Sequence, residues 1–225
     1  MSNKTLIMIP AYNESSTIGR VLDDLANQPY TLLVVDDGSV DETTRKAREK
    51  GVRVVRHAIN MGLGAAIATG LEVARREGFQ VAITFDADGQ HNPADIAKLL
   101  TELDSYDLVI GSRSICKKRM PFVKKVGNFM LNMMTLVFFG VRCTDSQSGL
   151  RAFNRKAIES IRVVSNRYEV SSEILYEARK KGLRIGEVPV EVIYTDYSVG
   201  KGTSLADGFK ILWRIILHKP GGDMR

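Results

Sequence analysis

Short runs of apolar, mostly β-branched residues alternate through the first half of the chain with segments whose apolar residues recur at helical spacing. The predicted strands span residues 5–9, 31–35, 52–55, 81–85 and 107–110. The predicted helices between them span residues 16–27, 42–50, 65–76 and 93–103. Continuously apolar strands separated by helices indicate a mostly parallel sheet with helices on both faces. The sequence therefore predicts a Rossmann-like α/β fold, and its 225 residues fit a single domain over residues 1–225.

The second half of the sequence is less regular. Val123–Phe139 is predicted to form a helix, residues 169–181 a second helix, and residues 186–194 a strand. Near the end, the apolar residues of 204–218 share one helical face and the charged residues share the opposite face, which predicts a C-terminal amphipathic helix. Such a helix either packs on its own domain or lies on a membrane surface, and the sequence leaves both interpretations open.

The positive charge of the chain is unevenly distributed. The formal net charge is +6, and no acidic residue occurs between Leu108 and Thr144. Within that stretch lies a group of cationic residues that we name the basic block: Arg113, Lys117, Lys118, Arg119, Lys124 and Lys125. A block of this kind suits nucleic acid, an anionic membrane surface or a phosphorylated substrate.

The cysteines and the apolar segments indicate where in the cell the protein is expected to be. Cys116 and Cys143 form no paired-spacing motif, so we predict neither a disulfide framework nor a cysteine zinc site. The first apolar run meets Pro10 at once, which excludes a signal peptide. The longest uncharged stretch, residues 126–141, is shorter than the roughly 20 apolar residues of a spanning helix. We expect a cytoplasmic protein that is soluble or peripheral on the cytoplasmic membrane face.

Acidic residues follow three of the predicted strands: Glu14 follows the first, Asp36 and Asp37 the second, and Asp86 and Asp88 the fourth. The carboxyl ends of parallel strands meet at one edge of a sheet, which is where ligands bind in such folds. We therefore expect these carboxylates to converge. Their mutual repulsion requires a cation or hydrogen-bond donors to compensate it.

Asp86 and Asp88 are the sharpest chemical signal in the sequence. Two residues separated by one position in extended chain point to the same side. Their oxygens, with a further one from Gln90, suit a Mg²⁺ or Mn²⁺ ion that keeps several waters and binds substrate phosphate oxygens. An ion held in this way neutralises a diphosphate and stabilises it as a leaving group.

Other polar motifs allow more than one interpretation. Asp36-Asp37-Gly38-Ser39 is either a turn and helix cap or a site whose carboxylate accepts hydrogen bonds from a nucleobase or ribose. In the loop 145–151, Asp145 would orient or deprotonate an acceptor and Arg151 would hold a phosphate or form a structural ion pair. Lys201 lies in a polar loop that would close over a diphosphate or simply lead into the last helix.

Eight motifs, in this order, make the sequence resemble family 2 glycosyltransferases with the GT-A fold. Within that family the likeness is to dolichyl- and polyprenyl-phosphate sugar synthases. The motifs are IPAYNE (9–14), VVDDGSVD (34–41), NMGLGAAIATG (60–70), FDADGQHNP (85–93), GSR (111–113), DSQSGLRAF (145–153), GEVPV (186–190) and the Lys201 loop. Together they cover most of residues 5–205.

The resemblance implies a role for each matched residue. The residues implied to bind the nucleotide sugar are Pro10, Tyr12, Glu14, Val35, Asp37, Asp86, Ala87, Asp88, Arg113 and Lys201. The metal ligands would be Asp86, Asp88 and Gln90, the catalytic residues Asp145 and Asp88, and the acceptor-phosphate residues Arg119 and Arg151. Thr195-Asp196 stand where mannose synthases carry an arginine, so the sugar, and the choice between a GDP-linked and a UDP-linked donor, stay open.

The resemblance also implies an inverting reaction, in which an acceptor oxygen attacks the anomeric carbon as the nucleoside diphosphate leaves. A polyprenyl phosphate such as dolichyl or undecaprenyl phosphate is already an anion, so Asp145 would mainly orient it. The basic block, followed by the apolar helix that ends at Phe139, favours such a lipid acceptor because both suit an anionic membrane surface. Membrane contact would be peripheral or provided by a partner protein.

Two alternatives remain from the sequence. In the first, a saccharide or protein hydroxyl is the acceptor and Asp145 is a required general base. In the second, the chain is a nucleic-acid-binding module that uses the basic block. Aromatic residues make up 7% of the chain and form no stacking run in the block, so we expect no nucleic-acid partner.

Overall fold

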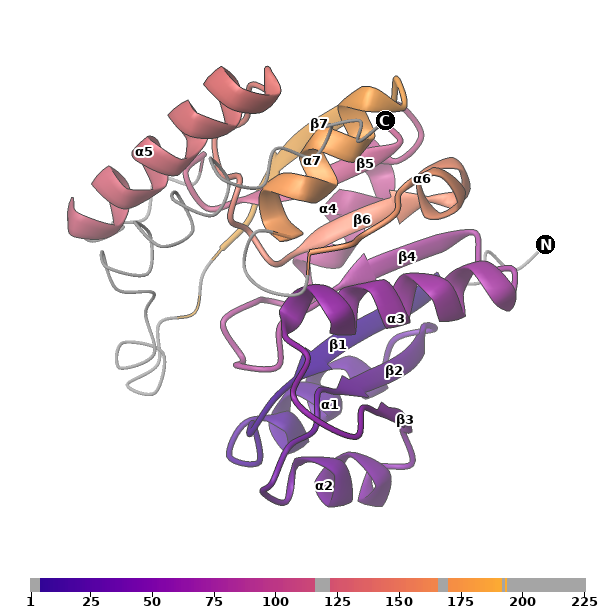
Figure 1. Ribbon diagram of the computed structural model, residues 1–225. Helices are drawn as coiled ribbons and strands as arrows, with labels where there is room; N and C mark the ends of the chain where they lie inside the picture. The colour runs from indigo at the N-terminus through magenta and orange to yellow at the C-terminus, as the bar shows by residue number, and fades with distance from the viewer. Residues whose placement is uncertain (1–4, 116–121, 166–169, 192, 194–225) are drawn as a thin grey trace, which may run out of the picture.

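The computed structural model describes residues 5–115, 122–165, 170–191 and 193, which form a single sheet flanked by helices (Figure 1). The strands are β1 Thr5–Ala11, β2 Thr31–Asp36, β3 Arg53–Arg56, β4 Val81–Thr84, β5 Leu108–Ser112, β6 Arg151–Asn154 and β7 Ile185–Pro189. The helices are α1 Ile18–Ala26, α2 Thr43–Glu49, α3 Leu63–Arg76, α4 Asp95–Glu102, α5 Phe122–Phe139, α6 Arg155–Ser160 and α7 Val170–Lys180. The predicted α/β fold is confirmed.

The seven strands lie in the order β3-β2-β1-β4-β6-β5-β7. All neighbouring pairs are parallel except those of β6, which runs antiparallel to both β4 and β5. Because β6 is reversed, its first residue, Arg151, pairs with Thr84 at the end of β4 and with Ile110 near the end of β5. The loop that precedes β6 therefore reaches the same sheet edge as the loops that follow β4 and β5.

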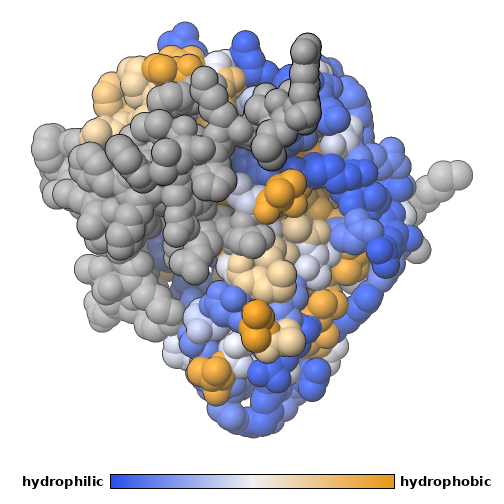
Figure 2. Space-filling model, viewed as in Figure 1, coloured by the Kyte–Doolittle hydropathy of each residue, from blue (hydrophilic) through white to orange (hydrophobic). Residues whose placement is uncertain are grey.

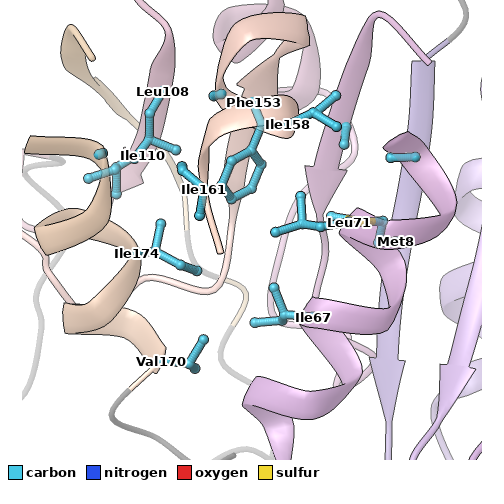
Figure 3. Packing of buried hydrophobic residues seen from close by; sticks show 14 of the residues in the cluster. Met8, Ile67, Leu71, Leu108, Ile110, Phe153, Ile158, Ile161, Val170 and Ile174 are labelled. Atoms are coloured by element: carbon cyan, nitrogen blue, oxygen red, sulfur yellow. The ribbon is translucent and has the colours of Figure 1, made fainter. Parts of the chain in front are cut away.

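Hydrophobic residues cover both faces of the sheet. Leu6 and Met8 of β1 pack with residues of α3, α6 and α7, whereas Ile7 and Ile9 pack with residues of α1, α2 and α4. This alternation is what a strand produces when successive side chains point to opposite faces. Figure 3 shows the first of these layers, in which Phe153 of β6 lies between residues of α3 and α7. Both layers hold the loops at the sheet edge in place.

Helix α5 lies to one side of the sheet, next to α7 (Figure 1). The ring of Phe139 of α5 packs at a tilt against that of Tyr176 of α7, with ring centroids 5.3 Å apart. Exposed apolar side chains also occur along α5, where Figure 2 shows a group of hydrophobic residues at the upper left. Among the described residues, no helix is long and apolar enough to cross a membrane. The predicted amphipathic helix at 204–218 lies outside the described residues.

Candidate functional site

The loops that follow β1 and β2 are tied together by hydrogen bonds. Asn13, with a left-handed φ of 54°, donates its backbone N–H to Ser39 Oγ at 2.9 Å and accepts from the Val40 amide at 3.0 Å. The Glu14 amide donates to Thr43 Oγ1 at 2.8 Å. Because the left-handed region is tolerated best by Gly, Asn and Asp, an asparagine suits this turn. The two loops therefore form one rigid rim.

Asp37 is buried and engages the loop between β3 and α3. Its carboxylate interacts with His57 Nδ1 at 2.7 Å and accepts from the amides of Met61 at 2.9 Å and Gly62 at 2.6 Å. Gly62 has a φ of 102°, a conformation that glycine adopts readily. Asp37 therefore fixes the start of α3, and the predicted contact between Asp37 and a base or ribose stays a prediction.

The neighbouring Asp36 is fully buried as well. It accepts from the Ser39 amide at 2.9 Å and from the hydroxyl of Thr44. Asp36 thus bonds within the turn, as one interpretation of the sequence allowed, whereas Asp37 bonds the loop before α3.

The other residues expected to bind a nucleotide differ in exposure. Tyr12 is 42% exposed beside the first loop, and Pro10 and Glu14 are partly buried. Val35 is fully buried, so its side chain belongs to the core. Ala87 is buried between the two acids that follow β4. Tyr12 is consequently the member of this group with the largest side-chain surface available for stacking on a base.

Asp86 and Asp88 lie together after β4, as predicted. The carboxylate of Asp86 interacts with His91 Nε2 at 3.0 Å. Asp88 accepts from the Gln90 backbone amide at 2.9 Å and from the Gln90 side-chain amide at 2.6 Å. His91 is buried, and its ring lies edge-on to Phe85 with centroids 5.6 Å apart. The sequence motif thus forms a compact turn in which His91, not singled out from the sequence, supports Asp86.

The two carboxylates have opposite pKa shifts. Burial acts to raise the pKa of Asp86, but the hydrogen bond with His91 and the charges of His91, Arg113 and Arg151 outweigh it and lower the pKa. Burial, and then the negative charge of Asp86, raise the pKa of Asp88. Repulsion from Asp86 thus adds to the effect of burial on the pKa of Asp88. A bound cation would relieve it.

The donor set fits a hard divalent cation. Among the described residues, no three His, Cys, Asp or Glu side chains are arranged as a ligand set for a metal ion. Mg²⁺, however, is usually held by one or two carboxylates together with waters and substrate phosphates, and Asp86 with Asp88 matches that pattern. Gln90 would have to release its contact with Asp88 to offer its oxygen. The metal site stays a prediction for all three residues.

Asp145 is fully buried and paired with Arg113. Asp145 Oδ2 accepts from Arg113 Nε at 2.7 Å, and its Oδ1 accepts from Arg113 Nη2 at 2.7 Å. The Arg113 backbone amide donates to the same carboxylate at 3.0 Å. The Arg113 side chain is 28% exposed, and its charge is felt by Asp86. The pair therefore holds a guanidinium at the site, in the fork geometry that suits carboxylates and phosphates.

Arg151 is bonded to backbone carbonyls around the loop before β6. Its side chain is buried, and its nitrogens donate to the carbonyls of Ser148 at 2.9 Å, Ser171 at 3.2 Å and Ser146 at 2.7 Å. Burial lowers the pKa of Arg151 to about 10. With these donors used inside the protein, Arg151 supports the loop before β6, and its contact with an acceptor phosphate stays a prediction.

Two residues that the sequence analysis left without a role are also part of the site. A Cβ on Gly149 would overlap the carboxylate of Asp86, so the loop before β6 lies directly against the acidic pair. Glu187 of β7 accepts from the Thr144 amide at 2.9 Å and from the Asp145 amide at 3.3 Å. Both residues lie within motifs quoted from the sequence. The predicted site residues Lys201 and Arg119 fall outside the described residues.

The sequence of the chain is similar to those of known proteins. The family model described as glycosyl transferase family 2 matches residues 6–162. The chain is 42% identical over 247 residues to UDP-N-acetylglucosamine–dolichyl-phosphate N-acetylglucosaminyltransferase from Methanococcus voltae, covering 98% of each chain. It is 30% identical over 213 residues to undecaprenyl-phosphate mannosyltransferase from Micrococcus luteus, covering 88% of this chain and 87% of the relative.

Solved structures share the fold. The crystal structure of glucosyl-3-phosphoglycerate synthase from Mycobacterium tuberculosis, in complex with Mn²⁺, uridine diphosphate and glucosyl-3-phosphoglycerate, superposes with a TM-score of 0.72. The superposition covers 96% of this chain and 78% of that chain, at 21% sequence identity. At this identity the likeness concerns the GT-A architecture.

Proposed function

The chain belongs to glycosyl transferase family 2, and from this premise we propose that it transfers a sugar from a nucleoside diphosphate to a polyprenyl phosphate. Both named relatives transfer a sugar to such a lipid, dolichyl phosphate in one case and undecaprenyl phosphate in the other. Their names differ in the sugar and agree in the kind of acceptor. The acceptor class is accordingly the part of the proposal that the relatives support most strongly.

The Asp145–Arg113 pair is the structural observation that favours a phosphate over a hydroxyl as the acceptor. A general base must have a free lone pair facing the proton that it removes. Both carboxylate oxygens of Asp145 accept from Arg113, and the residue is fully buried. A lipid phosphate needs no deprotonation, whereas a sugar or protein hydroxyl does. The geometry therefore favours an acceptor that is already an anion, with Asp145 acting through the orientation of Arg113.

The donor is proposed to be UDP-linked, with UDP-N-acetylglucosamine as the first candidate. The Methanococcus voltae relative uses this donor and matches nearly the whole of both chains. Tyr12 is the exposed aromatic beside the loops that follow β1 and β2. We place the base against Tyr12 and the diphosphate near Asp86 and Asp88, with Lys201 as a further phosphate contact.

In the proposed reaction each residue of the site has a separate role. The acceptor phosphate oxygen attacks the anomeric carbon from the side opposite the departing diphosphate, which inverts the configuration. Arg113, held by Asp145, orients and neutralises phosphate oxygens. Asp86 and Asp88, with Gln90, would hold Mg²⁺ or Mn²⁺, which when bound neutralises the charge of the leaving diphosphate. No proton needs to be removed from the acceptor.

A lipid acceptor requires the site to approach a membrane surface, and helix α5 is the proposed contact. Phe129, Met133 and Val137 follow one another at spacings of four residues and are 64%, 44% and 69% exposed. Side chains at this spacing lie on one helical face. In the sequence, the basic block precedes and overlaps the beginning of α5. An apolar face joined to cations is the pattern of a helix that lies in the interface of an anionic membrane.

The test is a transfer assay that separates lipid phosphate from lipid alcohol. Purified full-length protein is supplied with UDP-N-acetylglucosamine, Mn²⁺ and either dolichyl phosphate, undecaprenyl phosphate or the matching free polyprenol. We expect product with the phosphates and none with the alcohols. UDP-glucose and GDP-mannose in parallel identify the sugar. Chelation with EDTA should abolish transfer, and added Mn²⁺ should restore it.

Two variants distinguish the proposal from the alternative acceptor. Asp88→Asn should abolish transfer without loss of fold, because it removes a metal ligand and little volume. Asp145→Asn should retain more activity than Asp88→Asn if the acceptor is a phosphate. Transfer to a saccharide hydroxyl, lost by about 100-fold or more in Asp145→Asn, would instead establish the hydroxyl-acceptor alternative.

A further inference from the structure

The side chain of Asn132 on α5 spans the backbone on both sides of Asp145. Asn132 Nδ2 donates to the Thr144 carbonyl at 2.6 Å. Its Oδ1 accepts from the Ser146 amide at 2.9 Å. One side-chain amide therefore bonds the residue before Asp145 and the residue after it. The donor and acceptor of a primary amide are fixed in one plane, so this pair of bonds sets both the position and the direction of the intervening residue.

The remaining polar backbone groups of this segment are satisfied from other elements. Glu187 of β7 accepts from the amides of Thr144 and Asp145, and Arg151 donates to the Ser146 carbonyl. The Asp145 carbonyl accepts from the Ser148 amide at 3.3 Å. We name this set of hydrogen bonds to residues 144–146 the clamp, and Asn132 makes its two shorter contacts from α5. Asn128, one turn earlier, adds a longer contact of 3.3 Å to the Thr144 carbonyl.

We infer that Asn132 is a positioning residue for sugar transfer, acting through Asp145 on the guanidinium of Arg113. This inference rests on the proposed function. Asn132 bonds the backbone on both sides of Asp145, and Asp145 binds Arg113 by two side-chain hydrogen bonds. Arg113 is the residue proposed to contact the phosphates. Small displacements of a positioned charge cost large factors in rate.

Helix α5 would then have a second role beside the proposed membrane contact. Its polar face, with Asn128 and Asn132, holds the loop of Asp145, and a separate face carries the exposed side chains of Phe129, Met133 and Val137. Contact of that apolar face with a membrane would therefore fix the helix that fixes the loop. Transfer to a membrane-embedded acceptor depends more on Asn132 than donor binding does.

The first measurement is amide hydrogen exchange, which needs no substrate. Wild type, Asn132→Ala and Asn132→Asp are compared at the amides of Asp145 and Ser146. The Asp variant keeps an acceptor for the Ser146 amide but places an anion against the Thr144 carbonyl. We expect exchange at these amides to accelerate by at least tenfold in Asn132→Ala, while exchange in β1 and β4 is unchanged. Unchanged exchange at Ser146 would overturn the clamp.

The second measurement is a kinetic cycle with Asp145. Asn132→Ala should lower kcat for lipid-phosphate transfer by about 10-fold to 100-fold, while the thermal shift produced by the nucleotide sugar is retained. In the Asp145→Ala background the same substitution should cause no further loss, because residues that act through one another are not additive. Independent, additive losses would overturn the positioning role.

The matched control is Asn154→Ala. Asn154 also makes two side-chain amide bonds, accepting from the Ala157 amide at 2.9 Å and donating to Asp107 at 3.0 Å. It lies at the end of β6 opposite the site. We expect a lower melting temperature with unchanged kcat and unchanged exchange at Ser146. A wild type that transfers no sugar to any lipid phosphate would overturn the proposed function, while the exchange result still decides the clamp.

Discussion

At the scale of single residues, the site depends on how closely the backbone of Gly149 approaches Asp86. A Cβ at Gly149 would overlap both oxygens of the Asp86 carboxylate. The φ of Gly149 lies outside the left-handed region. The absence of a side chain at this position, rather than an unusual backbone conformation, therefore makes room for the acidic pair.

Gly149→Ala should displace the Asp86 carboxylate and reduce transfer. We expect a loss of about 100-fold in kcat, of the size caused by a misplacement of about 1 Å, with a weaker Mn²⁺-dependent thermal shift and a normal circular dichroism spectrum. Gly127→Ala is the matched control, because a Cβ on that helical glycine meets nothing within 4 Å. Full activity of Gly149→Ala would show that Asp86 need not occupy its present position.

Single residues also show which features of the site could be predicted from the sequence. The convergence of Asp86, Asp88 and Glu14 followed from strand ends, and the charges of Asp86 and Glu14 do act on Asp88. The role of Arg151 did not follow, because a basic residue in a polar loop gives no sign of whether its partners are carbonyls or phosphates. Only the reversed strand β6 buries it against the carbonyls of Ser146 and Ser148.

At the scale of elements, hydrogen bonds between loops help to build the edge of the sheet at which the site lies. Asp41 lies just before α2 and accepts from the amides of Thr43 at 3.0 Å and Ser15 at 3.1 Å. One carboxylate thus holds the start of α2 and the loop after β1. Burial acts to raise the pKa of Asp41, but the hydrogen bonds from Thr43 and Ser15 outweigh it and lower the pKa to about 2.

The pH dependence of Asp41 has a defined sign. A carboxyl whose pKa is lower in the folded state stabilises the fold above its unfolded pKa near 3.8, and this contribution is lost as the pH falls toward about 2. Asp41→Ala should cost about 1 kcal/mol at pH 7, as loss of a helix cap does. Urea unfolding at pH 7 and pH 2.5 checks this: the difference between wild type and variant should shrink at the lower pH. A constant difference would contradict the assignment.

The elements themselves were largely predictable. The apolar runs and helical periods placed β1 to β5 and α1 to α5 within a few residues of their observed bounds. Strand β6 and helix α6 were not predicted, because Arg151–Asn154 contains no β-branched residue and follows a polar loop. Its antiparallel direction depends on pairing with β4 and β5, a tertiary interaction that no local pattern encodes.

At the scale of the whole molecule, exposed apolar side chains gather along α5. Helix α5 lies at the opposite end of the molecule from α2 (Figure 1), and its exposed apolar side chains lie within the stretch from Leu108 to Thr144, which contains no acidic residue. Helix α2 also carries cations, but its Arg45 pairs with Glu42 and Glu49. Arg45 of α2 is thus offset by acidic neighbours, whereas the sequence around α5 contains no acidic residue.

This asymmetry predicts how the whole protein binds membranes. Replacing Lys117, Lys118 and Arg119 with Ser should weaken flotation with phosphatidylglycerol vesicles by roughly 100-fold at low salt, since each cation near an anionic surface contributes about 1 kcal/mol. Phe129→Ser with Val137→Ser should weaken binding at all salt concentrations, because the apolar contribution is not screened.

The control changes the net charge by the same amount at the other end of the molecule. Arg45, Arg48 and Lys50 of α2 and its C-cap are replaced with Ser. If α5 and the basic block form the contact, this variant binds vesicles almost as wild type does and transfers sugar to lipid phosphate normally. Equal weakening in both triple variants would mean that net charge alone drives binding. In that case α5 would not orient the site, and the coupling between Asn132 and the membrane would have no basis.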